Sequence, residues 1–169
     1  MSMAHEDRKV SLDRLMTQYG TRLLRLCTLY LKDFALAEDA VQDTFLKAYR
    51  RMDTFRGDCS EETWLTGIAI NTCRDYLRAA WLRHTDRRDI SALPEEACPP
   101  PLPDDTVLTE VMALKRKYRE VILLRYYQGL KLQETANALG ISQSTVRQRL
   151  RKACDILRTR LKEWYDEEE

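Results

Sequence analysis

Residues 132–151 read Leu-Gln-Glu-Thr-Ala-Asn-Ala-Leu-Gly-Ile-Ser-Gln-Ser-Thr-Val-Arg-Gln-Arg-Leu-Arg, and this stretch decides the fold of the C-terminal part of the chain. Ala136 is small at a point where two helices have to cross closely, and Gly140 suits a left-handed turn after the first helix. Ile141 is placed to fill the turn, and Ser142 is placed to cap a second helix. The pattern predicts two helices joined by a tight turn.

The second predicted helix has an apolar stripe on one side and hydrogen-bonding side chains on the other. The stripe consists of Val146, Leu150, Ala153 and Leu157. The opposite face presents Gln143, Ser144, Arg147, Gln148 and Arg151. In a major groove Arg suits guanine and Gln suits adenine, while the short side chains of Ser144 and Thr145 permit close approach. The same pattern also fits an ordinary helical hairpin with a solvated charged face.

Basic residues are concentrated around this motif. From Lys115 to Lys162 there are 13 Lys and Arg residues against three acids, a local charge of +10 in a chain whose net charge is +1. Three of these bases are placed to hold phosphates, namely Arg125, Arg149 and Lys152. A basic block of domain size in a nearly neutral chain favours nucleic acid as the partner of this part.

The rest of the chain is also predicted to be helical. Apolar residues recur at spacings of three and four from Leu12 to Tyr30, from Ala37 to Met52 and from Trp64 to Ala80, which is typical of amphipathic helices. Ser60 is placed as the N-cap of the last of these helices, ahead of two acids in its first turn. No alternating strand pattern occurs, so the sequence predicts an all-α fold.

All five prolines lie between Pro94 and Pro103. Proline cannot continue a helix, so we expect residues 91–105 to form a linker. The linker would divide the chain into two small helical domains, residues 1–90 and residues 106–169.

The cysteines show no metal-binding pattern. They are widely spaced, and neither histidine stands near one at a ligand-like spacing: Cys27, Cys59, Cys73, Cys98 and Cys154. We therefore expect no metal site, no cofactor and free thiols, with a redox role for Cys59 or Cys98 as the open alternative. The polar N-terminus lacks the apolar core of a signal peptide, and no long apolar run occurs. We expect a cytoplasmic protein without direct membrane insertion.

From about Leu12 to Leu161 the chain resembles the extracytoplasmic-function (ECF) sigma factors of the sigma-70 superfamily. Residues 37–49, Ala-Glu-Asp-Ala-Val-Gln-Asp-Thr-Phe-Leu-Lys-Ala-Tyr, resemble the helix that binds core RNA polymerase. Residues 55–58, Phe-Arg-Gly-Asp, together with residues 63–78, resemble the segment that melts the promoter and reads its minus-ten element. Residues 118–130 and the two-helix motif after them resemble the minus-thirty-five domain.

The resemblance implies a non-enzymatic subunit that gives RNA polymerase its promoter specificity. Its expected partners are core RNA polymerase (the beta-prime clamp and the beta flap), promoter DNA and an anti-sigma factor. The residues implied to contact the polymerase are Asp39, Gln42, Asp43 and Leu46, for which a solvated acidic face is the alternative. The residues implied to contact the minus-ten element are Phe55, Asn71, Arg74 and Arg78, with Arg83 as a further candidate. The minus-thirty-five candidates are Arg125, Ser144, Thr145, Arg147, Gln148, Arg151 and Lys152.

Two features depart from the family pattern. Residues 130–134, Leu-Lys-Leu-Gln-Glu, replace a Ser-Tyr-Glu-Glu type of helix start, so we expect a weaker N-cap there. Residues 59–62, Cys-Ser-Glu-Glu, form this chain's own version of a variable loop.

Two other classes of function compete with this interpretation. A free-standing helix-turn-helix repressor or response-regulator effector would share the C-terminal motif but not the polymerase-binding half. A nucleic-acid enzyme would need a phosphate loop or a carboxylate or metal constellation, and the sequence has no such pattern.

Overall fold

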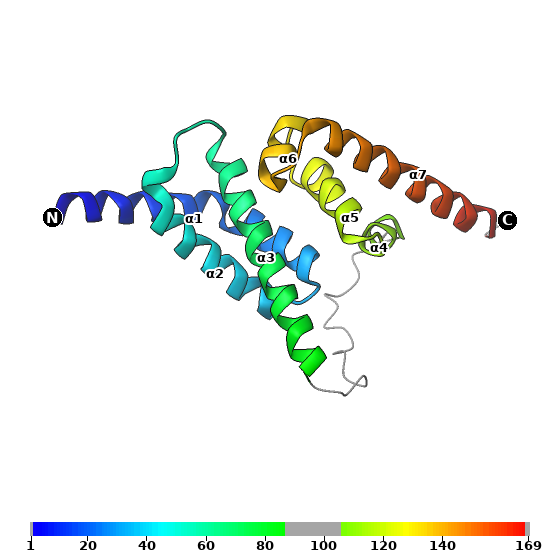
Figure 1. Cartoon of the computed structure of the whole chain (residues 1–169), viewed down its shortest axis with the longest axis horizontal. Helices are drawn as coiled ribbons and strands as arrows, with labels where there is room; N and C mark the ends of the chain where they lie inside the picture. Colours follow the sequence, from blue (N-terminus) through cyan, green and yellow to red (C-terminus); the bar gives the residue numbers. More distant parts are fainter. Residues whose placement is uncertain (1, 87–105, 168–169) are drawn as a thin grey trace. The chain divides into compact units, whose positions relative to one another are not determined.

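The computed structural model describes residues 2–86 and 106–167, with side chains for residues 7–83 and 106–162. These residues are helical and contain no β-strand, as the sequence predicts. They form two compact units, one that precedes and one that follows residues 87–105 in the sequence (Figure 1). The predicted proline linker lies outside the described residues.

Unit 1 is built from three long helices that pack on one another pairwise: α1 (Ser2–Leu31), α2 (Phe34–Arg51) and α3 (Glu61–Asp86). A short 3₁₀ turn, η1 (Met52–Thr54), follows α2, and a loop of residues 55–60 leads into α3. The predicted cap of α3 is confirmed, because the Ser60 hydroxyl accepts a hydrogen bond of 3.1 Å from the Thr63 N–H.

The core of unit 1 follows the predicted stripes. Its fully buried side chains include Leu26, Cys27, Ala40, Leu65 and Cys73. The thiols of Cys27 and Cys73 meet there, and this hydrogen bond together with burial raises the pKa of the Cys73 thiol. Met16 departs from its predicted stripe and is 47% exposed, whereas its neighbour Leu15 is 3% exposed, so α1 turns Leu15 and not Met16 toward the bundle.

Unit 2 contains α4 (Thr106–Met112), α5 (Arg116–Ile122), a π-helical segment η2 (Leu123–Tyr127), α6 (Leu132–Leu139) and α7 (Gln143–Glu167). The helix α7 packs against α4, α5 and α6. Its buried side chains include Val146 and Ala153, both predicted.

The turn between α6 and α7 confirms the sequence motif. Gly140 has φ of 65°, in the left-handed region that glycine adopts at low cost. Ala136 is buried at the helix crossing, and the Ser142 hydroxyl accepts a hydrogen bond of 3.2 Å from the Thr145 N–H. These local signals fix the entry of α7 and therefore the direction of its exposed face.

The start of α6 is capped in a different way from the family pattern. The Lys131 side chain is a donor only and cannot accept a cap hydrogen bond. The Glu134 carboxylate instead accepts one of 2.6 Å from the Lys131 backbone N–H. The helix therefore keeps one half of a capping box.

Candidate nucleic-acid interface

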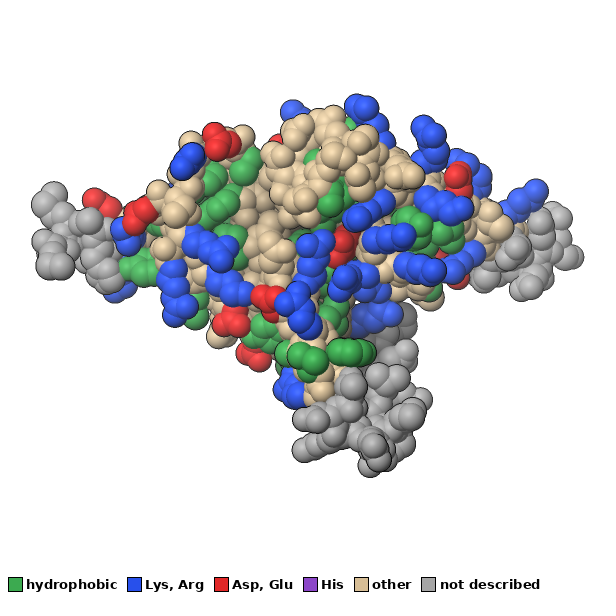
Figure 2. All heavy atoms as spheres, viewed as in Figure 1, with side chains coloured by type: hydrophobic (Ala, Val, Ile, Leu, Met, Phe, Trp, Pro, Cys, Tyr) green, Lys and Arg blue, Asp and Glu red, His purple; other side chains and the backbone are tan. Residues whose placement is uncertain are grey.

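The exposed face of α7 carries the polar side chains that the sequence singled out. Arg147, Gln148 and Arg151 are all exposed, whereas Val146 and Ala153 on the other side of the helix are fully buried. Ser144 is exposed as well, and its hydroxyl lies 2.9 Å from that of Ser142. Figure 2 shows several Lys and Arg side chains over the helices of unit 2. Such a face can donate hydrogen bonds to base edges and phosphates.

Thr145 and Arg125 are more engaged inside unit 2 than the sequence suggested. Thr145 is half-buried, and its hydroxyl lies 2.8 Å from that of Ser142. Arg125 is half-buried in the π-helical segment and donates a hydrogen bond of 3.0 Å to the Leu130 carbonyl. The Arg125 guanidinium thus supports the turn before α6, a contact that no local pattern reveals.

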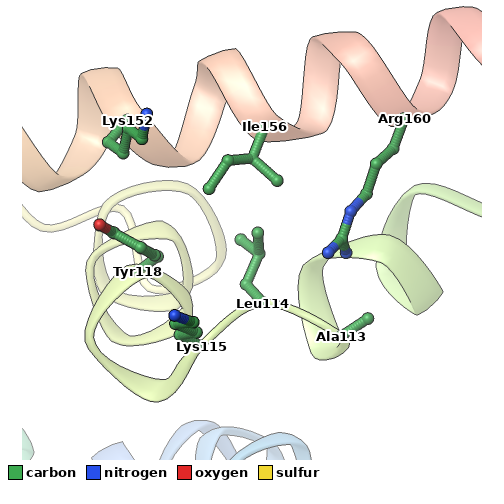
Figure 3. Close-up of a pocket in the computed structure, with 7 residues that line it drawn as sticks. All are labelled: Ala113, Leu114, Lys115, Tyr118, Lys152, Ile156 and Arg160. Carbon is green, nitrogen blue, oxygen red and sulfur yellow. The ribbon is translucent and has the colours of Figure 1, made fainter.

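Lys152 lies at a pocket on the flank of α7. The pocket has a volume of about 330 Å³ and is lined by Ala113, Leu114, Lys115, Tyr118, Lys152, Ile156 and Arg160 (Figure 3). Leu114 and Ile156 point toward one another, and Arg160 reaches from α7 to Glu110 on α4, 3.2 Å away. Lys152 is exposed at this flank, about 140° around the helix from Arg147 and about 40° from Gln148.

In unit 1 the minus-ten candidates share one side of α3. Asn71, Arg74 and Arg78 follow one another at spacings of three and four residues, which places them on one face. The Asn71 side-chain oxygen accepts a hydrogen bond of 3.3 Å from Arg74, and Asn71 is exposed. Arg78 lies 3.7 Å from Asp75, which also meets Lys47 of α2 at 3.5 Å. The outer candidate Arg83 donates a hydrogen bond of 3.4 Å to the Ala79 carbonyl.

Phe55 is half-buried and rests on Trp64, with ring centroids 4.9 Å apart and ring planes inclined at 34°. Trp64 precedes Asn71 by seven residues, about two helical turns, so both lie on the same side of α3. The structure therefore brings Phe55 to the side of α3 that carries Asn71.

The polymerase candidates on α2 fall into two groups. Asp39, Gln42 and Leu46 are exposed, and Leu46 is 52% exposed although it is apolar. Asp43 is half-buried and accepts a hydrogen bond of 2.8 Å from the Tyr76 hydroxyl on α3. Burial and this hydrogen bond raise the pKa of Tyr76 to about 12. Asp43 therefore also holds α2 against α3, a role that sequence reasoning missed.

Sequence reasoning also missed a set of ion pairs between α1 and the ends of loop 55–60. The Arg14 guanidinium donates two hydrogen bonds of 3.0 and 2.6 Å to the Glu61 carboxylate. This two-hydrogen-bond fork lowers the pKa of the Glu61 carboxyl. Arg22 lies 2.8 Å from Glu62, and Arg8 pairs with Asp53. In the sequence, Arg14 and Arg22 lie on a predicted helix and Arg8 lies before it, and this pattern does not identify their partners.

No group of His, Cys, Asp or Glu suited to a metal ion is found among the described residues. None of the helices in the described ranges is long and apolar enough to cross a membrane.

Comparison with known proteins gives two family matches in the same order as the two units. The family described as Sigma-70 region 2 matches residues 15–83, and the family described as Sigma-70, region 4 matches residues 112–159.

Two named relatives match over most of their own length. The RNA polymerase sigma-H factor of Pseudomonas aeruginosa is 30% identical over 88% of this chain and 85% of that protein. The ECF RNA polymerase sigma-E factor of Escherichia coli is 30% identical over 85% of this chain and 82% of its own length.

Among solved structures, CnrH in complex with the cytosolic domain of CnrY is similar, with a TM-score of 0.69 and 26% identity. That match covers 95% of this chain and 94% of CnrH. The sigma factor RpoE of Bartonella quintana, solved with the anti-sigma factor NepR, shares the fold with a TM-score of 0.73. The two sequences are 22% identical, and the match covers 97% of that chain and 90% of this one.

Proposed function

The chain belongs to the sigma-70 family as a sigma factor of the ECF type, and from this premise we propose how its two units divide the work of transcription initiation. Sigma factors of this family direct promoter recognition when RNA polymerase starts transcription. We assign residues 1–90 to core polymerase binding and to the minus-ten element, and residues 106–169 to the minus-thirty-five element. Residues 91–105 join the two parts.

The observation that carries the assignment of unit 2 is the exposed polar face of α7. Arg147, Gln148 and Arg151 project from a helix whose opposite side is buried, and Gly140 and Ser142 fix where that helix begins. A helix presented in this way fits a major groove, with its early residues at base edges. Lys152 would hold a phosphate beside it, while Ser144 and Thr145 allow close approach.

The minus-ten role of unit 1 is supported by the side of α3 that carries Asn71. An amide can read the Watson–Crick edge of an extruded base, and the Phe55 ring is an aromatic surface next to that side. Arg74 and Arg78 on the same face would attract the backbone of the opened strand.

The polymerase contact of unit 1 is assigned to α2. Asp39, Gln42 and Leu46 share an exposed side of this helix, and an exposed leucine among polar residues suits an interface. Asp43 would contribute from the edge of this surface, where it is already bound to Tyr76.

We further propose that the protein works in the cytoplasm, without catalytic activity and without a cofactor, and that an anti-sigma factor regulates it. The last point is supported by the similar sigma factor RpoE of Bartonella quintana, which was solved together with the anti-sigma factor NepR. A single partner that contacted both units would gain from their covalent connection.

Reconstituted transcription tests the function directly. Purified protein added to core RNA polymerase should produce a run-off transcript from its promoter, whereas either component alone should not. A free-standing repressor would instead bind promoter DNA and give no transcript with core polymerase.

The α2 surface is tested with a charge reversal and a matched control. Asp39→Arg should weaken core binding without altering the helical circular-dichroism signal, because Asp39 is exposed. Glu38→Arg makes the same charge change at an exposed neighbour about 100° away around the helix. Equal core affinity for the two variants would remove α2 from the proposed interface.

A further inference from the structure

Loop 55–60 stands between two rigid elements, η1 and α3, and its middle is exposed. Arg56, Gly57 and Asp58 are solvent-exposed, and Gly57 has φ of 74°, which lets the chain reverse there. Phe55 at one end packs on Trp64, and Ser60 at the other end caps α3. The orientation of the exposed residues in the middle of the loop therefore depends on the contacts that fix its two ends.

Both ends are held by arginines of α1. On the near side of the loop, Arg8 pairs with Asp53 of η1. On the far side, Arg14 binds Glu61 through a two-hydrogen-bond fork of 3.0 and 2.6 Å, and Arg22 lies 2.8 Å from Glu62. One helix, α1, thus contacts the segments immediately before and after the loop.

These pairs are poorly suited to holding the bundle together. The side chains of Arg14 and Arg22 are half exposed, and that of Asp53 is 65% exposed, so water screens their contribution to stability. The bundle has a separate apolar core in which α1 contributes Leu23, Leu26 and Tyr30. A planar guanidinium that binds a carboxylate through two hydrogen bonds instead orients the two side chains, because it fixes both the distance and the angle between them.

We propose that Arg14, assisted by Arg8 and Arg22, is a positioning residue for promoter opening: α1 sets the orientation of loop 55–60 and of Phe55 against the minus-ten strand. This inference rests on the proposed minus-ten role of Phe55 and Asn71. The arginines themselves do not contact the captured base. They act through Asp53, Glu61 and Glu62, which lie next to the two ends of the loop.

The test compares single variants of the full-length protein in a holoenzyme with core RNA polymerase. Two quantities are measured: the affinity for core polymerase, and the fraction of promoter in the open complex by permanganate footprinting. Arg14→Ala should leave core affinity unchanged and lower the open-complex fraction about two- to fivefold, the range in which a screened ion pair acts. Replacing Arg8, Arg14 and Arg22 together should lower it about tenfold.

Two further variants separate positioning from simple scaffolding. Arg14→Lys keeps the charge but loses the fork, so its open-complex fraction should fall between those of wild type and Arg14→Ala. Arg25→Ala is the matched control, because Arg25 is an exposed arginine of α1 with no ion pair in the described part of the chain. It should behave as wild type. Hydrogen exchange of residues 55–60 should quicken in Arg14→Ala and not in Arg25→Ala.

The outcomes distinguish this inference from the function on which it rests. If Phe55→Ala lowers open-complex formation but Arg14→Ala and the triple variant do not, the positioning role is wrong and the minus-ten role stands. If Phe55→Ala does not lower open-complex formation either, the minus-ten role is wrong, and the positioning role that rests on it is wrong as well. Loss of core affinity in Arg14→Ala equal to its loss of open complex would also overturn the proposal, because the ion pair would then support the unit as a whole.

Discussion

The two surfaces that we assign to DNA differ in how many of their polar side chains are already hydrogen-bonded or ion-paired within the protein. On α7 of unit 2, Arg147, Gln148 and Arg151 make no side-chain hydrogen bond or ion pair with the described residues. On α3 of unit 1, Asn71 is bonded to Arg74, and Asp75 stands between Arg78 and Lys47. A substitution on α7 should therefore change only what that side chain meets outside the protein, whereas one on α3 should also disturb its neighbours.

The same contrast extends to what supports each surface. The direction of α7 is set by backbone features a few residues away, at Gly140 and Ser142. The setting of α3 depends on side chains far away in sequence, from α1 and α2. Our assignment therefore gives duplex recognition to an element that is determined locally, and capture of the opened strand to an element that depends on the packing of a whole unit.

The largest expected effect tests whether the two regions are separate at all. Leu124 is fully buried in unit 2 and Leu65 is fully buried in unit 1. Leu124→Ala should destabilise unit 2 by about 2–5 kcal/mol, because it leaves a cavity in a small core. Hydrogen exchange should accelerate within residues 106–162 only, and Leu65→Ala should produce the reverse pattern. Acceleration in both units from either variant would show that they unfold as one.

An intermediate effect tests the independence of the α7 side chains. Arg147→Ala should cost about 1–3 kcal/mol on the preferred duplex and relax the preference at one or two base pairs, without a change in thermal stability. The measurement is selection from a randomised duplex library, combined with a melting curve.

Lys152→Ala supplies the contrast on the same helix. Because Lys152 lies about 140° around the helix from Arg147, its loss should weaken binding to all sequences alike and make the salt dependence shallower by about one unit. Identical selected sequences and identical salt slopes for the two variants would contradict base reading by Arg147. We exclude Arg125→Ala from this pair, because Arg125 also supports the Leu130 turn.

The smallest effect concerns the network between α2 and α3. Tyr76→Phe removes the hydrogen bond to Asp43 and should cost about 0.5–1.5 kcal/mol of unit 1 stability at neutral pH. The folded-state pKa of Tyr76 is raised to about 12 from an ordinary value near 10. The stabilisation is therefore fully present below about pH 10 and is lost as pH rises toward 12.

Denaturant unfolding followed across this range measures the difference between the two proteins. The gap in stability between wild type and Tyr76→Phe should close as the pH approaches 12. A gap that stayed constant from neutral pH to pH 12 would mean that the Tyr76 hydroxyl does not depend on Asp43 in the folded state.

Features that depend on nearby residues could be predicted from the sequence. The helix stripes, the Ser60 and Ser142 caps and the left-handed Gly140 each have a signal within a few positions, and all are present in the structure. The exposed face of α7 followed from the same reasoning, because knowing one buried side of a helix fixes the other.

Features that depend on pairing between helices could not be predicted. Asp43 and Tyr76 are 33 residues apart, and Arg14 and Glu61 are 47 apart, so no local pattern couples them. The π-helical segment Leu123–Tyr127 was also missed, since its apolar residues fit an α-helix equally well. The Gln128 N–H donates a hydrogen bond to the Leu123 carbonyl five residues earlier, where the chain enters the turn before α6.

The buried thiol pair of unit 1 gives the chain an internal reporter of its own opening. Cys27 comes from α1 and Cys73 from α3, and neither has any exposed surface. An alkylating reagent needs both access and a thiolate, and the packed core withholds both, because the contact with Cys27 and burial raise the pKa of the Cys73 thiol. The rate at which these two thiols are modified therefore counts how often α1 and α3 part. Cys154 is half-buried in unit 2, and its rate of modification reports separately on the opening of that unit.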